Sequence, residues 1–154
     1  MLTFQVESYS KVRDEVAALT IQHYEEIALF KDKIKLDPDY ERYEVLEEKG
    51  ILCFITVRDS DVGNKIVGYH ISLVMPHLHY KSTLIGITDI FFLDKEYRQG
   101  LEGLKLFKFF EEEMLRRGVK EIMAGTKLRL NLGKMFTHLG WIETDHMYAK
   151  WIGD

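Results

Sequence analysis

The sequence predicts a mixed α/β fold in one domain, on three observations: a strand followed by a turn and an amphipathic helix, a return strand, and an earlier hairpin. The first strand is Asp89 to Leu93, and the helix after its glycine-containing turn runs to Arg117 with apolar residues three and four apart. Val119 to Ala124 returns as a strand, so the crossover has parallel or nearly parallel ends. A chain of 154 residues fits one domain with one core, spanning residues 1–154.

The other elements follow from periodicity, caps and turn residues. In chain order we expect a strand at 3–7, a helix to about His23, helical stretches at 25–35 and 40–49, strands at 51–57, 65–74 and 84–93, a short helix at 131–139, and a last strand or bent hairpin at 142–151. Pro38 interrupts the helical period, and the turn cluster at 59–64 makes the pair around it an antiparallel hairpin.

Composition excludes several classes of protein. No apolar run approaches the length of a membrane span, and the N-terminus lacks the plan of a signal peptide, so we expect a cytoplasmic protein without a membrane anchor. A net charge of −4 argues against general nucleic-acid binding, which depends on Lys and Arg. The single cysteine, Cys53, lies in an apolar strand and is expected to be buried rather than nucleophilic.

The turn before the central helix has the character of an anion site. Gly103 begins the helix without a Cβ, so a ligand can approach its backbone closely. Free N–H groups in the first turn and the helix dipole favour an anion there, and phosphate is the natural ligand. The alternative is that this turn serves packing alone.

The residues around this turn resemble a known family. Tyr97-Arg98-Gln99-Gly100-Leu101-Glu102-Gly103, followed by Leu104-Lys105-Leu106, resembles the acetyl-CoA loop of the GNAT N-acetyltransferases. Arg98 and Gly103 match that pattern, whereas Leu101 stands where the middle glycine belongs, with Gly100 beside it. The resemblance extends over nearly the whole chain to small phage-type and bacterial GNATs, through residues 77–81, 88–91, 125–127 and 148–151.

The resemblance implies a mixed central sheet of six to seven strands, splayed at the cofactor site and flanked by about four helices. It also implies acetyl-CoA as co-substrate. Phe92 and Leu93 would pair their backbone with its pantetheine arm, and Asn131 would contact that arm unless it serves as a helix N-cap. The pyrophosphate would bind the backbone of the loop formed by Arg98, Gln99, Gly100, Leu101, Glu102 and Gly103.

Three residues are candidates for acid–base chemistry. Asp89 lies in an otherwise apolar strand, where desolvation would raise its pKa toward that of a useful base. Strand alternation places it on the face of Phe91 and Leu93, and the alternative is a structural aspartate that accepts hydrogen bonds. His79 would lie at the pocket rim or relay a proton through water, or be a plain surface histidine.

The family's usual acid, a tyrosine before the Leu139-Gly140 pair, is replaced here by Phe136, which has no proton to donate. Tyr148 on the expected last strand is the candidate to replace it, and a core tyrosine is the alternative. We expect no metal site, because His77 and His79 alone are too few ligands for zinc.

Two functions remain open at this point. One is transfer of an acetyl group from acetyl-CoA to a primary amine, of a small molecule or a protein, by direct attack. The other is a catalytically silent GNAT-like module for protein binding or assembly. The acidic stretch 37–48 would attract a cationic amine or form a solvated helix face, and the resemblance leaves a homodimer open.

Overall fold

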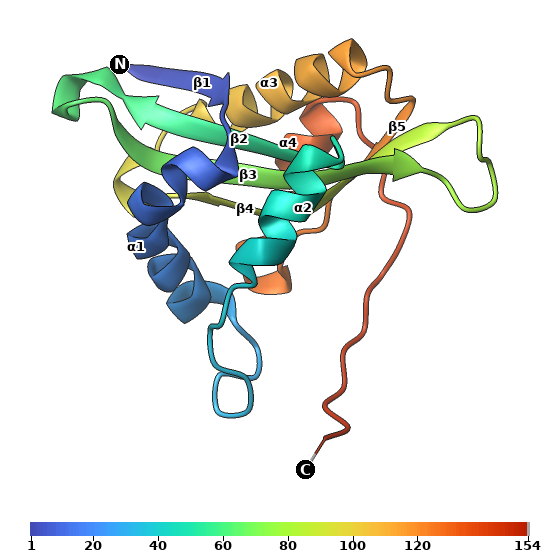
Figure 1. The fold of residues 1–154 in the computed structure, drawn as a ribbon, viewed down its shortest axis with the longest axis horizontal. Coiled ribbons are helices and arrows are strands. Elements are labelled where there is room, and N and C mark those ends of the chain that lie inside the picture. The colour runs from blue at the N-terminus through green and yellow to red at the C-terminus, as the bar shows by residue number, and fades with distance from the viewer. Residues whose placement is uncertain (154) are drawn as a thin grey trace.

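The computed structural model describes residues 1–153 and contains one five-stranded sheet with helices on both faces (Figure 1). The strands lie in chain order, β1 to β4 antiparallel, and β5 parallel to β4. The elements are β1 (Leu2–Val6), α1 (Tyr9–Ile27), α2 (Tyr40–Glu48), β2 (Leu52–Asp59), β3 (Lys65–Pro76), β4 (Leu84–Leu93), α3 (Glu102–Arg116), β5 (Glu121–Met123) and α4 (Gly133–His138). The mixed α/β fold and the crossover through α3 are therefore confirmed.

The predicted count of six to seven strands is wrong, because the described chain has five. The residues expected to form the last strand, 142–151, are extended but pair with no strand (Figure 1). They bury little of their apolar surface, since Ile142 is 83% and Met147 92% exposed. An extended segment becomes a strand only by hydrogen bonding to an edge, and β5 offers an edge of three residues.

The helical stretch predicted at 25–35 is also wrong. α1 ends at Ile27, Ala28 takes an extended conformation, and a loop continues to Asp39. The hydroxyl of Tyr24 donates to the Ile34 carbonyl at 2.6 Å, so the loop folds back onto α1. The predicted helix after it is confirmed as α2, where the Asp39 carboxylate accepts from the Arg42 N–H and begins the helix.

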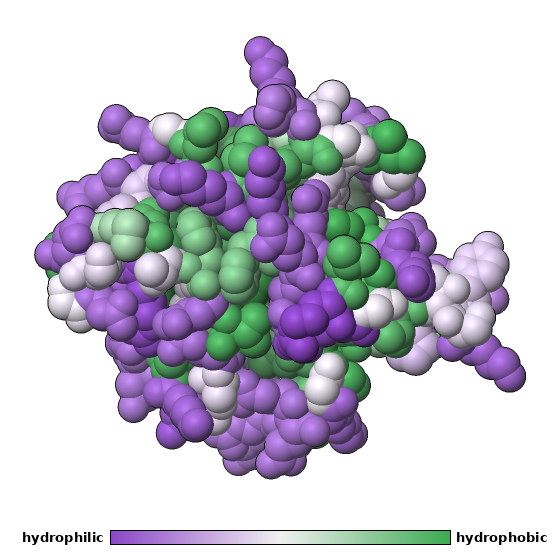
Figure 2. All heavy atoms as spheres, turned by 90° about the horizontal axis from the view of Figure 1, so that it is seen from above, coloured by the Kyte–Doolittle hydropathy of each residue, from purple (hydrophilic) through white to green (hydrophobic). Residues whose placement is uncertain are grey.

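The sheet separates two hydrophobic cores. α3 and α4 cover one face, with Leu106, Phe107, Phe110 and Met114 of α3 buried against it. α1 and α2 cover the other face. In β2 the alternation is regular: Cys53, Ile55 and Val57 pack toward α3, whereas Leu52 and Phe54 pack toward α1. The outer surface, seen from above, is largely hydrophilic with smaller apolar areas between the polar side chains (Figure 2).

The close approach of β3 and β4 depends on a glycine. A Cβ on Gly68 would lie 2.8 Å from both the Leu93 Cδ1 atom and the Phe92 carbonyl oxygen. We therefore expect Gly68→Ala to lower the free energy of unfolding by about 1–3 kcal/mol, as overpacked sites do. Urea denaturation measures this, with Gly125→Ala as the control because a Cβ there meets nothing within 4 Å. Equal stability of the two variants would contradict the close approach.

Candidate active site

β4 is paired on both sides for only part of its length. Its residues Ile85 to Ile87 pair with β5, and from Thr88 onward that edge has no strand partner in residues 1–153. β3 continues to pair with β4 along the other edge as far as Leu93. The two parallel strands therefore separate after Ile87 and leave an open, unpaired backbone edge.

The ladder shows which backbone groups face this open edge. Asp94 N–H donates to the Val67 carbonyl at 2.8 Å, so the neighbouring pair of Leu93 and Gly68 is a non-hydrogen-bonded pair. The N–H and carbonyl groups of Leu93, and by the two-residue repeat those of Phe91, point away from β3. Those of Phe92 point toward β3. The Leu93 carbonyl already accepts from Arg98 Nε at 2.6 Å, which leaves the N–H of Leu93 and both groups of Phe91 available.

The turn after β4 presents a run of free donors. None of the backbone N–H groups from Gln99 to Leu104 donates a well-formed hydrogen bond within the part of the chain that the structure describes. The first bond of α3 runs from Lys105 N–H to the Leu101 carbonyl at 2.9 Å. The Glu102 carboxylate forms an ion pair with Lys105 Nζ at 2.7 Å. The arrangement suits an anion with several oxygens.

Small or outward side chains keep this turn open. Gly100 has a φ of +86°, a conformation that other residues rarely adopt. A Cβ on Gly103 would meet only the Met135 sulfur, at 3.7 Å. Leu101, which replaces the middle glycine of the family pattern, is 62% exposed and points its side chain away from the core.

The side chain of Arg98 holds the turn rather than reaching toward an anion. Its two terminal nitrogens donate to the Glu26 carboxylate at 2.6 and 2.8 Å, and its guanidinium lies over the Phe92 ring. The Arg98 hydrogen bond lowers the pKa of Glu26 below its ordinary range. Arg98 thus ties the end of α1 to the turn.

Asp89 occupies a β-bulge. In the register of β3 and β4, Ile71 pairs with Ile90 and Ser72 with Thr88, so Asp89 is the extra residue. Thr88 faces α3, where its hydroxyl lies 3.1 Å from His70 Nε2, and Phe91 packs against Phe107 of α3. Asp89 and Ile90 instead both face the α1 and α2 side. The prediction that Asp89 shares a face with Phe91 and Leu93 is therefore wrong, because the bulge resets the alternation.

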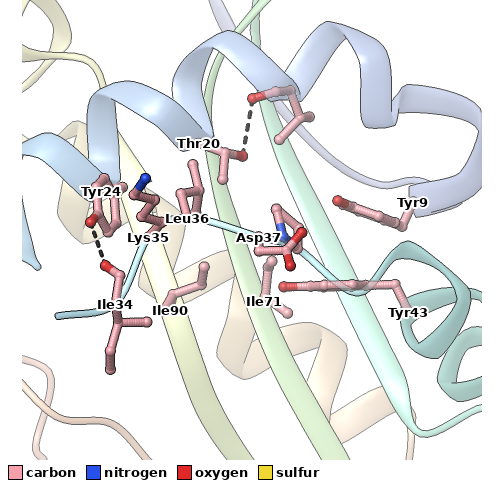
Figure 3. A pocket seen from close by; sticks show the side chains of 12 residues that line it. Tyr9, Thr20, Tyr24, Ile34, Lys35, Leu36, Asp37, Tyr43, Ile71 and Ile90 are labelled. Atoms are coloured by element: carbon pink, nitrogen blue, oxygen red, sulfur yellow. Dashed lines mark hydrogen bonds between the residues drawn. The ribbon is translucent and has the colours of Figure 1, made fainter. Parts of the chain in front are cut away.

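On this side Asp89 lines a cavity of about 420 Å³ between α2 and the sheet. The rest of its lining is Asp39, Arg42, Tyr43, Leu46, Ile51, Leu52, Ile71, Leu73 and Met75. A smaller cavity of about 270 Å³ lies under α1 and the 34–38 segment and shares Tyr43 and Ile71 with the first (Figure 3). Figure 3 shows Tyr43 reaching from α2 toward Ile71.

The electrostatics of Asp89 suit a base. Partial burial raises the pKa of its carboxyl above the ordinary range of aspartate. No hydrogen bond or ion pair to its carboxylate is formed within residues 1–153, so a structural acceptor role has no partner there. Burial also raises the pKa of Tyr43, and the charge of Asp89 adds to that effect. Tyr43 lines both cavities but is not among the candidates named from the sequence. The pattern that could have indicated it is a tyrosine three residues after Tyr40 in an acidic helix.

The structure does not bring the other predicted residues to these cavities. Tyr148 is 94% exposed on the unpaired segment 141–153. His79 lies in the exposed turn after β3, where its N–H donates to His77 Nδ1. The Asn131 side-chain oxygen accepts from Gly133 N–H at 2.7 Å in the turn before α4, whose N-cap is Leu132 and not Asn131. Phe136 is buried against Phe107 and Trp141 and offers no hydroxyl.

Residues 1–153 contain neither a cluster of metal ligands nor a membrane-spanning helix. No group of three or more His, Cys, Asp or Glu side chains in this range is placed to hold a metal ion. None of the helices described is both long and apolar enough to cross a membrane.

Comparison with known proteins turned up matches among solved structures. No sequence model of a protein family and no curated protein sequence matches the chain. Glucosamine-6-phosphate N-acetyltransferase from Arabidopsis thaliana superposes with a TM-score of 0.75 at 12% identity, covering 99% of each chain. Ribosomal-protein-alanine N-acetyltransferase from Brucella melitensis biovar Abortus 2308 gives 0.71 at 14%, covering 99% of this chain and 100% of that one.

A predicted acetyltransferase from Clostridium acetobutylicum, determined with acetyl-CoA, gives a TM-score of 0.69 at 14% identity, covering 97% of this chain and 96% of that one. The chain has the GNAT fold. The family resemblance of the sequence is thus confirmed at the level of fold. The strands β4 and β5, which separate after Ile87, belong to the sheet of this GNAT fold. Identities of 12% to 14% show a shared fold and say nothing about the acceptor.

The raised pKa of Asp89 has a consequence for stability. When a carboxyl has a higher pKa in the folded state than in the unfolded state, its ionisation destabilises the folded protein. Stability is therefore lost as pH rises from the unfolded-state pKa, about 3.9, through the folded-state pKa. Asparagine cannot ionise, so we expect Asp89→Asn to be at least as stable as the wild type at pH 7. Its relative advantage should vanish near pH 4. Urea denaturation at both pH values measures this.

Asp145→Asn, on the exposed segment 141–153, is the matched control for the change from aspartate to asparagine. A loss of about 1–3 kcal/mol in Asp89→Asn at pH 7 would instead show that the carboxylate accepts a structural hydrogen bond.

Proposed function

We propose that the protein is an N-acetyltransferase that moves the acetyl group of acetyl-CoA to a primary amine by direct attack. One observation carries the proposal: the bulge turns the Asp89 carboxylate into a cavity at the point where β4 leaves β5, and the same strand leads into the run of free N–H groups at 99–104. A base, an open strand edge and an anion site therefore follow one another along β4 and the turn after it.

The residues present fit acetyl-CoA. The free N–H groups of Gln99, Gly100, Leu101, Glu102 and Gly103 would hold the pyrophosphate, and Arg98 would keep their turn in place through Glu26. The pantetheine arm would add to the open edge of β4 as an extra strand, along Phe91, Phe92 and Leu93. The backbone groups of Phe91 and the Leu93 N–H face outward from the ladder, which supports their use in this pairing. Asn131 stays a prediction, since one of its side-chain groups is already used.

The chain itself would supply a base and backbone hydrogen-bond donors for the transfer. Acetyl-CoA, when bound, supplies the acetyl group as a reactive thioester. Asp89, with its raised pKa, accepts a proton from the attacking ammonium or amine, directly or through water. Backbone N–H groups at the open edge of β4 donate to the thioester carbonyl as charge develops on its oxygen. Because Phe136 has no hydroxyl, the departing thiolate takes its proton from water, and Tyr148 and His79 stay predictions.

The buried Phe136 is also the observation that favours the second function, a silent GNAT-like module for protein binding. Calorimetric titration with acetyl-CoA separates the two. Micromolar binding supports the transferase, and no binding at millimolar concentration supports the module.

Replacement of Gly103 tests the anion site. In Gly103→Val the branched side chain would stand beside the free N–H groups, and we expect acetyl-CoA affinity to fall at least tenfold, about 1.4 kcal/mol. The site has room for a Cβ, so the loss should come without unfolding. Calorimetry gives the affinity, with Glu112→Val on the exposed part of α3 as the control for a β-branched residue in this helix. Unchanged affinity in a folded Gly103→Val protein would refute the pyrophosphate assignment.

Replacement of Asp89 tests the base. Asp89→Asn keeps the size of the side chain but cannot take a proton, so turnover should fall by about 10²-fold or more while acetyl-CoA affinity barely changes. The pH profile of kcat/KM, measured with an accepted amine, should lose its acidic limb in the variant. A profile and turnover like those of the wild type would transfer the role to a water molecule or to another residue.

A further inference from the structure

The larger cavity is built mainly from apolar side chains. Seven of its ten lining residues are aliphatic, aromatic or methionine, contributed by α2, by β2 with the residue before it, and by β3. They are Tyr43, Leu46, Ile51, Leu52, Ile71, Leu73 and Met75. A volume of about 420 Å³ lies in the range of small-molecule sites, which are mostly apolar with a few polar groups that fix orientation.

The three charged residues in the lining are not equivalent. The Asp39 carboxylate accepts from the Arg42 N–H at 3.0 Å and is used as the cap of α2. Arg42 brings a positive charge to the same end of the cavity. Asp89, at the sheet, has no hydrogen-bond partner within residues 1–153, so both oxygens of its carboxylate are left for a ligand.

These charges select for one positive group. The Asp89 side chain is exposed, so an ammonium beside its carboxylate would gain a charge partner and keep part of its hydration. A second ammonium against the apolar side chains of the lining would be desolvated without a carboxylate partner, and the positive charge of Arg42 would oppose it. Polyamines and aminoglycosides carry several such groups. An amine with many hydroxyls would likewise lose hydrogen bonds to water against these walls, where Tyr43 is the one uncharged polar side chain.

We propose that the acceptor is a monocationic primary amine with an apolar aliphatic or aromatic body, whose body fills the cavity between α2, β2 and β3 while its amine meets Asp89. This inference rests on the proposed acetyl transfer and names the acceptor class for it. The acidic residues on the outer face of α2 then serve its solvation, and they do not define the acceptor.

A homologous series of amines tests the acceptor class directly. Ethylamine, butylamine and hexylamine have nearly the same pKa, so they differ chiefly in the apolar area that the cavity can bury. We expect kcat/KM for acetyl transfer to rise about fourfold for each added methylene until the cavity is full. Spermidine, glucosamine and tobramycin should be poorer acceptors than hexylamine.

Filling the cavity should invert this preference. Met75 lines the cavity but belongs to neither hydrophobic core, so Met75→Trp adds volume there without disturbing the packing of the sheet. We expect Met75→Trp to favour ethylamine over hexylamine. Leu78→Trp is the matched control, because Leu78 lies just beyond β3 and is 95% exposed, and it should keep the preference of the wild type.

The possible results distinguish a failure of the acceptor class from a failure of the transferase proposal. A flat series, or a better rate with spermidine, glucosamine or tobramycin than with hexylamine, overturns the acceptor class and leaves acetyl transfer standing. Absence of acetyl-CoA binding overturns the transferase itself. In that case calorimetry with hexylamine alone still decides the cavity: binding that is lost in Met75→Trp supports an apolar amine site, and no binding to the wild type overturns it.

Discussion

The extra residue in β4 determines how the site is built. Before the bulge, Thr88 faces α3, and after it Phe91 and Leu93 face α3 again, so the strand keeps its place in both cores. Asp89 and Ile90 take the opposite face in succession. A regular strand through this point would direct either the carboxylate or the following apolar residues to the wrong side of the sheet. The bulge lets an apolar strand carry one charged side chain to a cavity at little cost to packing.

A second constraint holds the turn after β4 relative to α1. Glu26 lies one residue before the end of α1. Its carboxylate accepts hydrogen bonds from both terminal nitrogens of Arg98, and its backbone carbonyl accepts one from Arg129. The end of α1, the turn after β4 and the segment after β5 therefore meet at one residue. The partly exposed ion pair adds little to global stability, and its value lies in fixing geometry. The side chain of Arg98, although it matches the family pattern, is thus committed to Glu26 and to the Leu93 carbonyl.

Much of the fold could be predicted from the sequence, because the long periodic segments are decided by local pattern. β4 ends at Leu93 and α2 begins at Tyr40 as expected, and the helix of the crossover is α3. The failures lie where tertiary context decides. No sequence signal marks a bulge, so the orientation of Asp89 could not be predicted, although its desolvation could. The segment 142–151 is extended, but strand pairing depends on an edge that its own residues do not encode.

The loop between α1 and α2 supplies Ile34, Lys35, Leu36, Asp37 and Pro38 to the smaller cavity, yet it contributes nothing to the strand that carries Asp89. It is held to α1 by the hydroxyl of Tyr24, which donates to the Ile34 carbonyl, and by the Lys31 ammonium, which contacts the Glu25 side chain and backbone carbonyl. The walls of the smaller cavity and the strand that carries Asp89 therefore belong to separable parts of the polypeptide. A descendant with a different loop can reshape the smaller cavity while it inherits the strand, the bulge and the carboxylate unchanged.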